Sequence, residues 1–136
     1  MRILIYGLNH SPELTGIGKY NGEMASWLSK KGHDVRVICA PPYYPAWKVS
    51  PGYSRFGFTK EVIEGCLVIR CPLWVPSQPG GLKRILHLAS FAISSFFALI
   101  SNFLWRPEVV FVVEPPLFCA PNAILFSKCV GAKSWL

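Results

Sequence analysis

The chain has 136 residues, of which 51% are hydrophobic and 15% are charged. This composition excludes intrinsic disorder, and the length predicts a single domain, because most domains have about 100 to 150 residues. The net charge of +7 favours an anionic partner such as a phosphate, an anionic lipid surface or a nucleic acid.

The first forty residues predict a strand, a helix and a second strand. Arg2–Tyr6 and Val35–Ala40 are short, apolar and rich in β-branched residues, which is typical of buried parallel strands. Between them, Ile17–Lys31 has the spacing of an amphipathic helix that ends before Gly32. We expect its apolar stripe to face the core; the stripe comprises Ile17, Tyr20, Met24, Trp27 and Leu28. The three elements form a βαβ unit with a right-handed crossover.

An aromatic loop and a hairpin follow. Residues 41–58 are rich in proline and aromatic residues and lack periodicity. Residues 60–63 and 67–70 flank an acidic-glycine pair, which predicts a β-hairpin. Glu61 and Glu64 are expected to be exposed on it.

The stretch from Ile85 to Trp105 has no charged residue across 21 positions. Its length permits a membrane span of about 30 Å. Small and polar residues nevertheless form a stripe suited to packing against a sheet or another helix; they are His87, Ser90, Ser94, Ala98 and Ser101. A buried or membrane-surface helix and a transmembrane helix are the two interpretations, and the stripe favours the first.

Three elements complete the chain. Val109–Val113 predicts a strand, Ala120–Val130 a helix with a proline in its first turn, and 132–136 the opening of another strand. We therefore predict an α/β fold with a Rossmann-like, doubly wound, mostly parallel sheet. We also expect a fragment of a longer protein, because a sheet that stops on an unfinished strand leaves its edge and its helices uncovered.

The titratable residues limit the chemistry. A single aspartate, Asp34, cannot build an Asp-x-Asp metal site, and no two cysteines have the spacing of a zinc knuckle, so we expect neither a metal nor a cofactor. The five cysteines indicate buried thiols in a reducing compartment. The amino-terminal apolar run is too short for a signal peptide, which predicts cytoplasmic synthesis.

Ligands of an open parallel sheet bind beyond the carboxyl ends of its strands. Gly16 and Gly18 lie there, at the start of the first helix, where backbone N–H groups and the helix dipole favour a phosphate. A plain helix start that tolerates glycine is the alternative. An NAD site is disfavoured because the third glycine is missing, and Ala40–Pro42 stands where an acidic ribose-binding residue would be expected.

Four segments together resemble the amino-terminal domain of a bacterial GT-B glycosyltransferase of family four; they are Ile3–Gly7, Ser11–Tyr20, Ala40–Pro45 and Val113–Leu117. The resemblance covers essentially all of the chain. It implies a retaining, metal-independent transfer from a GDP- or UDP-sugar to an acceptor held between two Rossmann-like domains. This chain would be the acceptor-side domain, and the domain that holds most of the nucleotide-sugar would be missing. The implied reaction is that of a fucosyltransferase extending a polyprenyl-linked oligosaccharide in exopolysaccharide biosynthesis.

The resemblance also assigns roles to residues. Gly16 and Gly18 would face the donor phosphates, and Lys19 and Tyr20 would extend this glycine loop. Glu114 is the candidate catalytic residue, which would orient the acceptor or receive its hydroxyl proton. It could equally cap the helix that follows.

The residues themselves supply four more candidates. His10 could contact an acceptor hydroxyl or be a solvated loop histidine. Trp47 suits stacking on a sugar or dipping into lipid, against plain packing of the aromatic loop. Lys83 and Arg84 suit anionic lipid headgroups or a polyprenyl diphosphate, against a solvated helix start.

We therefore expect a glycosyltransferase domain that is peripheral on the inner face of the plasma membrane and inactive without its second domain. The alternative is a membrane-associated lipid- or acceptor-binding module without catalysis, based on the basic residues and the long apolar helix. A nucleic-acid partner is disfavoured because the basic residues are scattered and no recognised reading helix is present.

Overall fold

The computed structural model describes residues 1–13, 16–44, 46–54, 56–78, 80–113 and 119–135. Its elements in chain order are β1 (Arg2–Gly7), α1 (Gly16–Lys30), β2 (Asp34–Cys39), β3 (Thr59–Ile63), β4 (Cys66–Arg70), α2 (Gly81–Ser101), β5 (Val109–Val113), α3 (Cys119–Val130) and β6 (Lys133–Trp135). Every strand and helix expected from the sequence is present.

The strands form one sheet in the order β3-β4-β2-β1-β5-β6. β3 is antiparallel to β4, as a hairpin requires, and the other neighbours are parallel. The chain runs outward from β1 through β2 to the hairpin and then returns, along α2, to place β5 on the other side of β1. The strand order therefore reverses beside β1, and ligands of doubly wound sheets bind at the carboxyl ends of the strands where such a reversal occurs.

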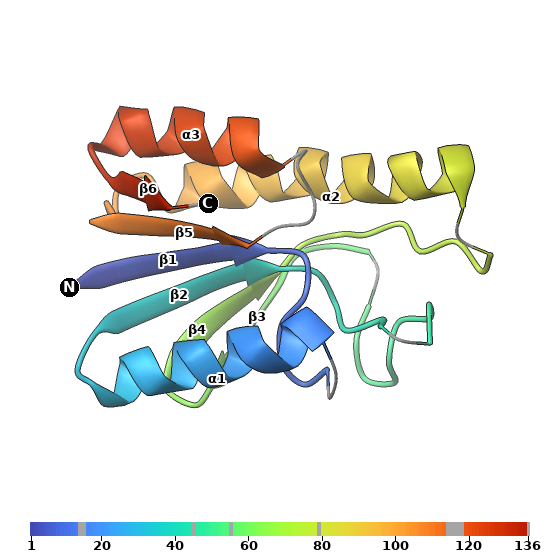
Figure 1. The fold of residues 1–136 in the computed structure, drawn as a ribbon, viewed down its shortest axis with the longest axis horizontal. Coiled ribbons are helices and arrows are strands. Elements are labelled where there is room, and N and C mark those ends of the chain that lie inside the picture. The colour runs from blue at the N-terminus through green and yellow to red at the C-terminus, as the bar shows by residue number, and fades with distance from the viewer. Residues whose placement is uncertain (14–15, 45, 55, 79, 114–118, 136) are drawn as a thin grey trace.

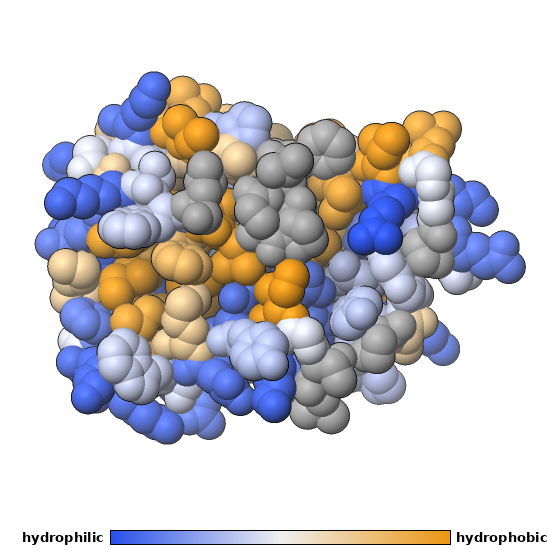
Figure 2. Space-filling model, in the orientation of Figure 1, coloured by the Kyte–Doolittle hydropathy of each residue, from blue (hydrophilic) through white to orange (hydrophobic). Residues whose placement is uncertain are grey.

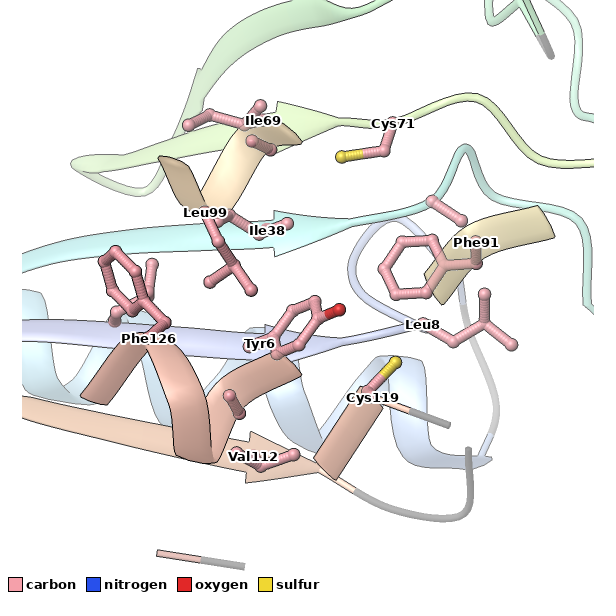
Figure 3. Close-up of a cluster of buried hydrophobic side chains, with 14 of the residues drawn as sticks. Tyr6, Leu8, Ile38, Ile69, Cys71, Phe91, Leu99, Val112, Cys119 and Phe126 are labelled. Carbon is pink, nitrogen blue, oxygen red and sulfur yellow. The ribbon is translucent and has the colours of Figure 1, made fainter. Parts of the chain in front are cut away.

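The sheet is covered on both faces, by α1 on one side and by α2 and α3 on the other (Figure 1). Leu4 and Tyr6 of β1 belong to the core beneath α2 and α3, whereas Ile3 and Ile5 belong to the core beneath α1. Figure 3 shows the larger of these two cores, with Phe91 of α2 above Tyr6. Because both faces of the sheet are covered there, the adjacent strands β1 and β5 are almost entirely apolar instead of alternating with polar residues.

The expected apolar stripe of α1 is partly wrong. Tyr20 and Trp27 are 66% and 58% exposed, and the residues that α1 buries are Gly18, Asn21 and Ala25. The loop after β1 passes so close to the first turns of α1 that no large side chain fits between them. Small residues therefore face the sheet, and the aromatic ones are turned to the surface.

α2 begins and ends four residues earlier than the uncharged stretch predicts. It includes Lys83 and Arg84 in its first turn and ends where Asn102 leaves the helix. The Asn102 side chain donates to the carbonyl of Ala98 (2.8 Å) and accepts from Arg36 of β2 (2.8 Å). Asn102 is a buried side chain whose amide donor and acceptor are both hydrogen-bonded, and it fixes the end of α2. A search of the sequence for charged residues does not detect this signal.

The expectation that Glu61 is an exposed hairpin residue is wrong. Its carboxylate accepts from the guanidinium of Arg70 at 2.9 Å and from the Tyr53 hydroxyl at 3.2 Å, and its side chain is about one-third exposed. Glu64 is exposed as expected, at 3.9 Å from the Lys30 ammonium. The difference follows from the pairing of β3 with β4, which turns Glu61 toward the buried end of the hairpin.

Candidate functional site

A cleft of about 250 Å³ lies at the carboxyl ends of β1 and β2. Four segments line it: the loop after β1, the first turn of α1, the loop after β2, and the start of α2. The lining residues are Leu8, Asn9, Gly16, Ile17, Gly18, Tyr43, Tyr44, Trp47, Arg84, His87 and Leu88. We call it the β1–β2 cleft; it is mostly apolar and aromatic, with a few polar groups, as small-molecule sites usually are.

Glu13 joins the loops on the two sides of this cleft. One oxygen of its buried carboxylate accepts from the backbone N–H groups of Tyr43 (2.9 Å) and Tyr44 (2.8 Å). The other oxygen accepts from the side-chain amide of Asn9 at 2.9 Å. A single side chain therefore holds two aromatic residues of the cleft in place beside the loop after β1.

Glycine is favoured at positions 16 and 18 for two different structural reasons. Gly16 has a φ of +66°, a left-handed conformation that favours glycine at the start of α1. Gly18 is required by contact, because a Cβ there would lie 2.5 Å from a Glu13 carboxylate oxygen and 3.2 Å from the carbonyl of His10. The glycines thus allow α1 to approach the Glu13 loop, and they leave the first turn of α1 open to the cleft.

Three rings form one wall of the cleft. The ring centroids of Tyr43 and Trp47 are 5.3 Å apart, and the His87 ring lies 5.0 Å from Tyr43 and 5.1 Å from Trp47. The guanidinium of Arg84 stands 6.0 Å from the Trp47 ring centroid. Burial raises the pKa of Tyr43 to about 12, so this phenol stays protonated at neutral pH.

His87 is buried in this wall, and its Nδ1 lies 2.7 Å from the carbonyl oxygen of Trp74. Its Nε2 has no hydrogen-bond partner among the residues that the structure describes. Burial lowers the pKa of His87, and the nearby charge of Arg84 acts in the same direction, whereas the Trp74 contact opposes them. The imidazole is therefore neutral under ordinary conditions.

Arg70 lies behind the cleft at the end of β4 and is 1% exposed. Its guanidinium donates to the carbonyl oxygens of Ala40 (2.9 Å) and Ser11 and to the Glu61 carboxylate. It therefore ties the ends of β2 and β4 to the loop after β1. This buried cation is satisfied by its partners and faces away from the cleft lining.

His10 is 2% exposed, so the interpretation as a solvated histidine is wrong. Burial lowers its pKa to about 4, and the positive charge of Arg70 contributes in the same direction. The ring is thus neutral at pH 7. His10 is not among the residues that line the β1–β2 cleft.

The cysteines and the possible metal-ligating side chains are the remaining reactive groups that the sequence singled out. Cys39, Cys66, Cys71 and Cys119 are buried as expected, but Cys129 is exposed. Burial raises the pKa of Cys39 to about 12, so this thiol is inert at neutral pH. In the described ranges, no group of three or more histidine, cysteine or acidic side chains is arranged to hold a metal ion.

The comparison with protein families decides the identity of the domain. Residues 15–129 match the model of the glycosyl transferase 4-like domain. The chain belongs to this family.

Individual proteins agree with this assignment. A protein of Escherichia coli (strain K12) named "Putative colanic acid biosynthesis glycosyl transferase WcaI" is 56% identical over 137 residues, an alignment covering 100% of this chain and 33% of that protein. The glycosyl transferase 4-like domain described here thus spans a third of the length of that relative.

Two solved structures have a similar fold. Sucrose-phosphate synthase from Thermosynechococcus elongatus matches with a TM-score of 0.59 and 13% identity, over 93% of this chain and 30% of that chain. A ugt transferase from Siraitia grosvenorii in complex with UDP matches with a TM-score of 0.55 and 15% identity, over 98% of this chain and 27% of that chain. These likenesses confirm the predicted fold class, the Rossmann-like amino-terminal half of a GT-B fold.

The structure of this glycosyl transferase 4-like domain brings together only part of the predicted site. Gly16, Gly18, Trp47 and Arg84 all line the β1–β2 cleft. Four others do not: Lys19, Tyr20 and Lys83 are exposed outside it, and His10 is buried outside it. Glu114 lies outside the described residues, so its predicted role stays a prediction.

Sequence reasoning missed the residues that shape the cleft of this domain. Glu13 and Arg70 were not singled out, and His87 was interpreted only as a packing residue. One available signal is that Arg70 ends an otherwise apolar strand, where a buried charge needs partners. Glu13 offered little local signal, because two of its three hydrogen-bond partners, Tyr43 and Tyr44, are about thirty residues away in the chain.

α2 is the one helix in the described part of the chain that is long and apolar enough to cross a membrane. One of its faces is nevertheless packed on the sheet, through residues that include His87, Phe91 and Ser95. Its opposite face is exposed and apolar, with Leu82, Leu86, Ile93, Phe97 and Ile100 in one stripe. Hydrophobic side chains gather beside hydrophilic ones at the end of the molecule where α2 begins (Figure 2).

Proposed function

We propose that this domain is the acceptor-side, amino-terminal half of a glycosyltransferase and that the β1–β2 cleft holds the sugar acceptor. The observation that carries the proposal is the cleft itself. It lies at the carboxyl ends of the parallel strands and has an aromatic wall, an arginine and an open helix start. Flat aromatic rings suit the faces of sugars, and family membership supplies the reaction class.

The proposed reaction transfers a sugar from a nucleotide-sugar to a lipid-linked oligosaccharide. Following the resemblance and the name of the E. coli relative, the donor is a GDP- or UDP-sugar, with fucose as the sugar, and the product belongs to an exopolysaccharide such as colanic acid. The transfer is retaining and needs no metal. The donor is bound mainly by a second domain of the whole protein, outside the 136 residues of this chain.

In this mechanism the residues of the domain act by positioning and by charge. The free N–H groups at the start of α1 face the diphosphate that leaves as the glycosidic bond breaks, and the helix dipole stabilises its negative charge. Gly16 and Gly18 let the phosphates approach this backbone. The aromatic wall orients the acceptor so that its hydroxyl meets the sugar carbon. Glu114 remains the proposed group for the acceptor proton.

The proposal includes a place in the cell. The domain is peripheral on the inner face of the plasma membrane, where a polyprenyl-linked acceptor would be available. The exposed apolar stripe of α2, with Lys83 and Arg84 in its first turn, supports this position. The same stripe favours the alternative, a membrane-associated module that binds lipid or acceptor without catalysis.

Binding of a short-chain prenyl diphosphate oligosaccharide to the purified chain tests the acceptor assignment. We expect Trp47→Ala to weaken this binding by about tenfold, because loss of one aromatic stacking surface costs about 1.5 kcal/mol. Trp27→Ala is the matched control, since Trp27 is exposed on α1 outside the cleft. Equal effects of the two substitutions would refute the assignment.

A transfer assay separates the two candidate functions. The purified chain alone should give no transfer from GDP-fucose or UDP-glucose, because most of the donor site is in the other domain. Turnover by the chain alone would contradict that statement. Vesicle binding without affinity for the oligosaccharide would favour the module.

A further inference from the structure

His87 is a buried polar residue of the aromatic wall, and its ring nitrogens have no role in the proposal above. It is 1% exposed and lines the cleft between Tyr43 and Trp47. A histidine packed only for its apolar ring would be expected to have both nitrogens satisfied by the protein, because an unpaired buried polar atom destabilises the folded state. Here only one of them is satisfied within the described chain.

The contact with Trp74 decides which nitrogen carries the proton. Nδ1 lies 2.7 Å from a carbonyl oxygen, which can only accept a hydrogen bond. Nδ1 must therefore be the donor, and in the neutral ring Nε2 is left with a lone pair. The unsatisfied nitrogen is thus an acceptor and needs a partner that donates.

The chemistry of this acceptor selects among ligands. A hydroxyl group can donate to a neutral nitrogen, whereas the oxygens of a fully ionised diphosphate cannot. The neighbouring rings of Tyr43 and Trp47 also favour the C–H face of an uncharged sugar ring over an anion. The cleft volume of about 250 Å³ is a little below the usual range for ligand pockets, about 300–1,000 Å³, and suits one sugar ring.

Nε2 of His87 is enclosed by its neighbours in the unliganded structure. We propose that it becomes open to the β1–β2 cleft when a sugar binds there and accepts a hydrogen bond from a hydroxyl of the sugar ring. This inference rests on the proposed function and adds to it the group that recognises the acceptor. The charged part of the acceptor then lies toward Arg84, and the start of α1 is left for the diphosphate of the donor. Lys83 and Arg84 contribute to binding of a diphosphate, and His87 contributes to binding of the sugar.

The test uses the purified chain with ¹⁵N-labelled histidine and four probes: the methyl glycosides of fucose, galactose and glucose, and sodium diphosphate. In the free protein, we expect the His87 nitrogen spectrum of a ring protonated at Nδ1 only. At least one glycoside should shift the Nε2 resonance toward that of a protonated nitrogen and leave Nδ1 in place. Diphosphate should not shift Nε2.

Three variants separate recognition from folding. His87→Asn keeps an amide N–H for the Trp74 carbonyl but removes the Nε2 acceptor, so glycoside affinity should fall by about tenfold with an unchanged near-ultraviolet circular dichroism spectrum. His87→Gln places an amide oxygen within reach of the Nε2 position and should retain affinity within about threefold. His33→Asn, at a partly exposed histidine far from the cleft lining, should bind as the wild type does.

The failures are distinguishable. A glycoside could shift the Trp47 indole resonance but leave the Nε2 resonance unchanged, and His87→Asn could bind that glycoside as tightly as the wild type. This result would refute the role of His87 and leave the assignment of the acceptor cleft standing. If diphosphate shifts the Nε2 resonance and the His87→Asn substitution weakens diphosphate binding, the ligand is an anion and the inference fails. If no glycoside changes any cleft resonance, both the inference and the acceptor assignment fail.

Discussion

Glu13 controls the shape of the β1–β2 cleft although its side chain does not line it. Its carboxylate accepts three hydrogen bonds, two of them from the backbone of Tyr43 and Tyr44. Hydrogen bonds to charged groups contribute about 1.5 to 3 kcal/mol each, and their loss leaves buried donors unpaired. The position of the aromatic wall therefore depends on one carboxylate thirty residues away in the chain.

Glu13→Ala should lower the free energy of unfolding by about 3 kcal/mol, because it removes the acceptor of three N–H donors. Urea unfolding followed by fluorescence measures this change. Glu23→Ala is the matched control, since Glu23 is exposed on α1, and it should change stability by less than about 0.5 kcal/mol. Similar losses in both variants would mean that Glu13 does not hold the loops.

His10 should make stability depend on pH. Its pKa falls from 6.5 in the unfolded chain to about 4 in the folded one, so the unfolded state binds more protons between these values. The stabilisation is complete above pH 6.5 and is lost as the pH falls, by about 2 kcal/mol at pH 5 and about 3 kcal/mol at pH 4. His87 adds a loss of the same sign.

Urea unfolding of the wild type and of His10→Gln at pH 7, 5 and 4 measures this dependence. The variant should lose less stability than the wild type over the same range, and the difference is the contribution of His10. His33→Gln should follow the wild type. Parallel curves for the wild type and His10→Gln would contradict the assignment of a buried neutral imidazole.

At the level of elements, the start of α1 is the feature that matters most for the site. Gly18 allows close contact with Glu13 and His10, whereas Gly16 adopts a left-handed conformation with only an ordinary contact, 3.7 Å from the Tyr44 ring. The two glycines lie on the same turn, but backbone conformation favours glycine at position 16 and close packing requires it at position 18. The helix start is therefore built for close approach, beyond any role as a phosphate site.

Gly18→Ala should cost about 2 to 4 kcal/mol, because the new methyl group displaces the Glu13 carboxylate and breaks its bonds. Gly16→Ala should cost only about 1 kcal/mol, the price of a left-handed alanine. Thermal or urea unfolding of both variants measures the difference. A Gly18→Ala variant as stable as Gly16→Ala would show that the close contact with Glu13 is relieved easily.

The elements were predictable because their signals are local. The apolar run of β1 and the turn between β3 and β4 both lie within a few residues of sequence. The burial of α1 was not predictable, since Tyr20 and Trp27 fit a helical stripe and only the neighbouring loop shows why Gly18 faces inward. The prediction of the cleft residues was incomplete for the same reason, because most hydrogen-bond partners of Glu13, Arg70 and His87 lie in other segments of the chain. Gly16 and Trp47 lie in the segments that follow β1 and β2, and their residue types together with that topology were enough to predict them.

At the scale of the whole molecule, α2 has one face packed on the sheet and one apolar face that is exposed among the described residues. α2 packs on the sheet through its buried residues and exposes the stripe that includes Ile93 and Phe97. Lys83 and Arg84 stand in its first turn, near the cleft that Arg84 helps to line. A surface of this kind, apolar with cations at one end, is suited to lie on an anionic membrane with the cleft close to it.

The chain should float with vesicles that contain anionic phosphatidylglycerol, and less with purely zwitterionic vesicles. The double variant Ile93→Ser, Phe97→Ser should bind at least about tenfold more weakly, because burial of each apolar side chain contributes about 1.5 to 3 kcal/mol. The control is Ile124→Ser, Leu125→Ser on the exposed side of α3, which should float like the wild type. Equal flotation of all three proteins would exclude α2 as the membrane contact.

The central claim is that the β1–β2 cleft holds the acceptor of a glycosyltransferase. The most direct test replaces the matching third of WcaI with this chain, in E. coli cells that lack their own WcaI, and measures colanic acid. We predict that the chimera restores the polysaccharide, that Trp27→Ala leaves it restored, and that Trp47→Ala reduces it strongly at the same protein level. A chimera present at the normal level that restores nothing, or that works equally well with both substitutions, would contradict the claim.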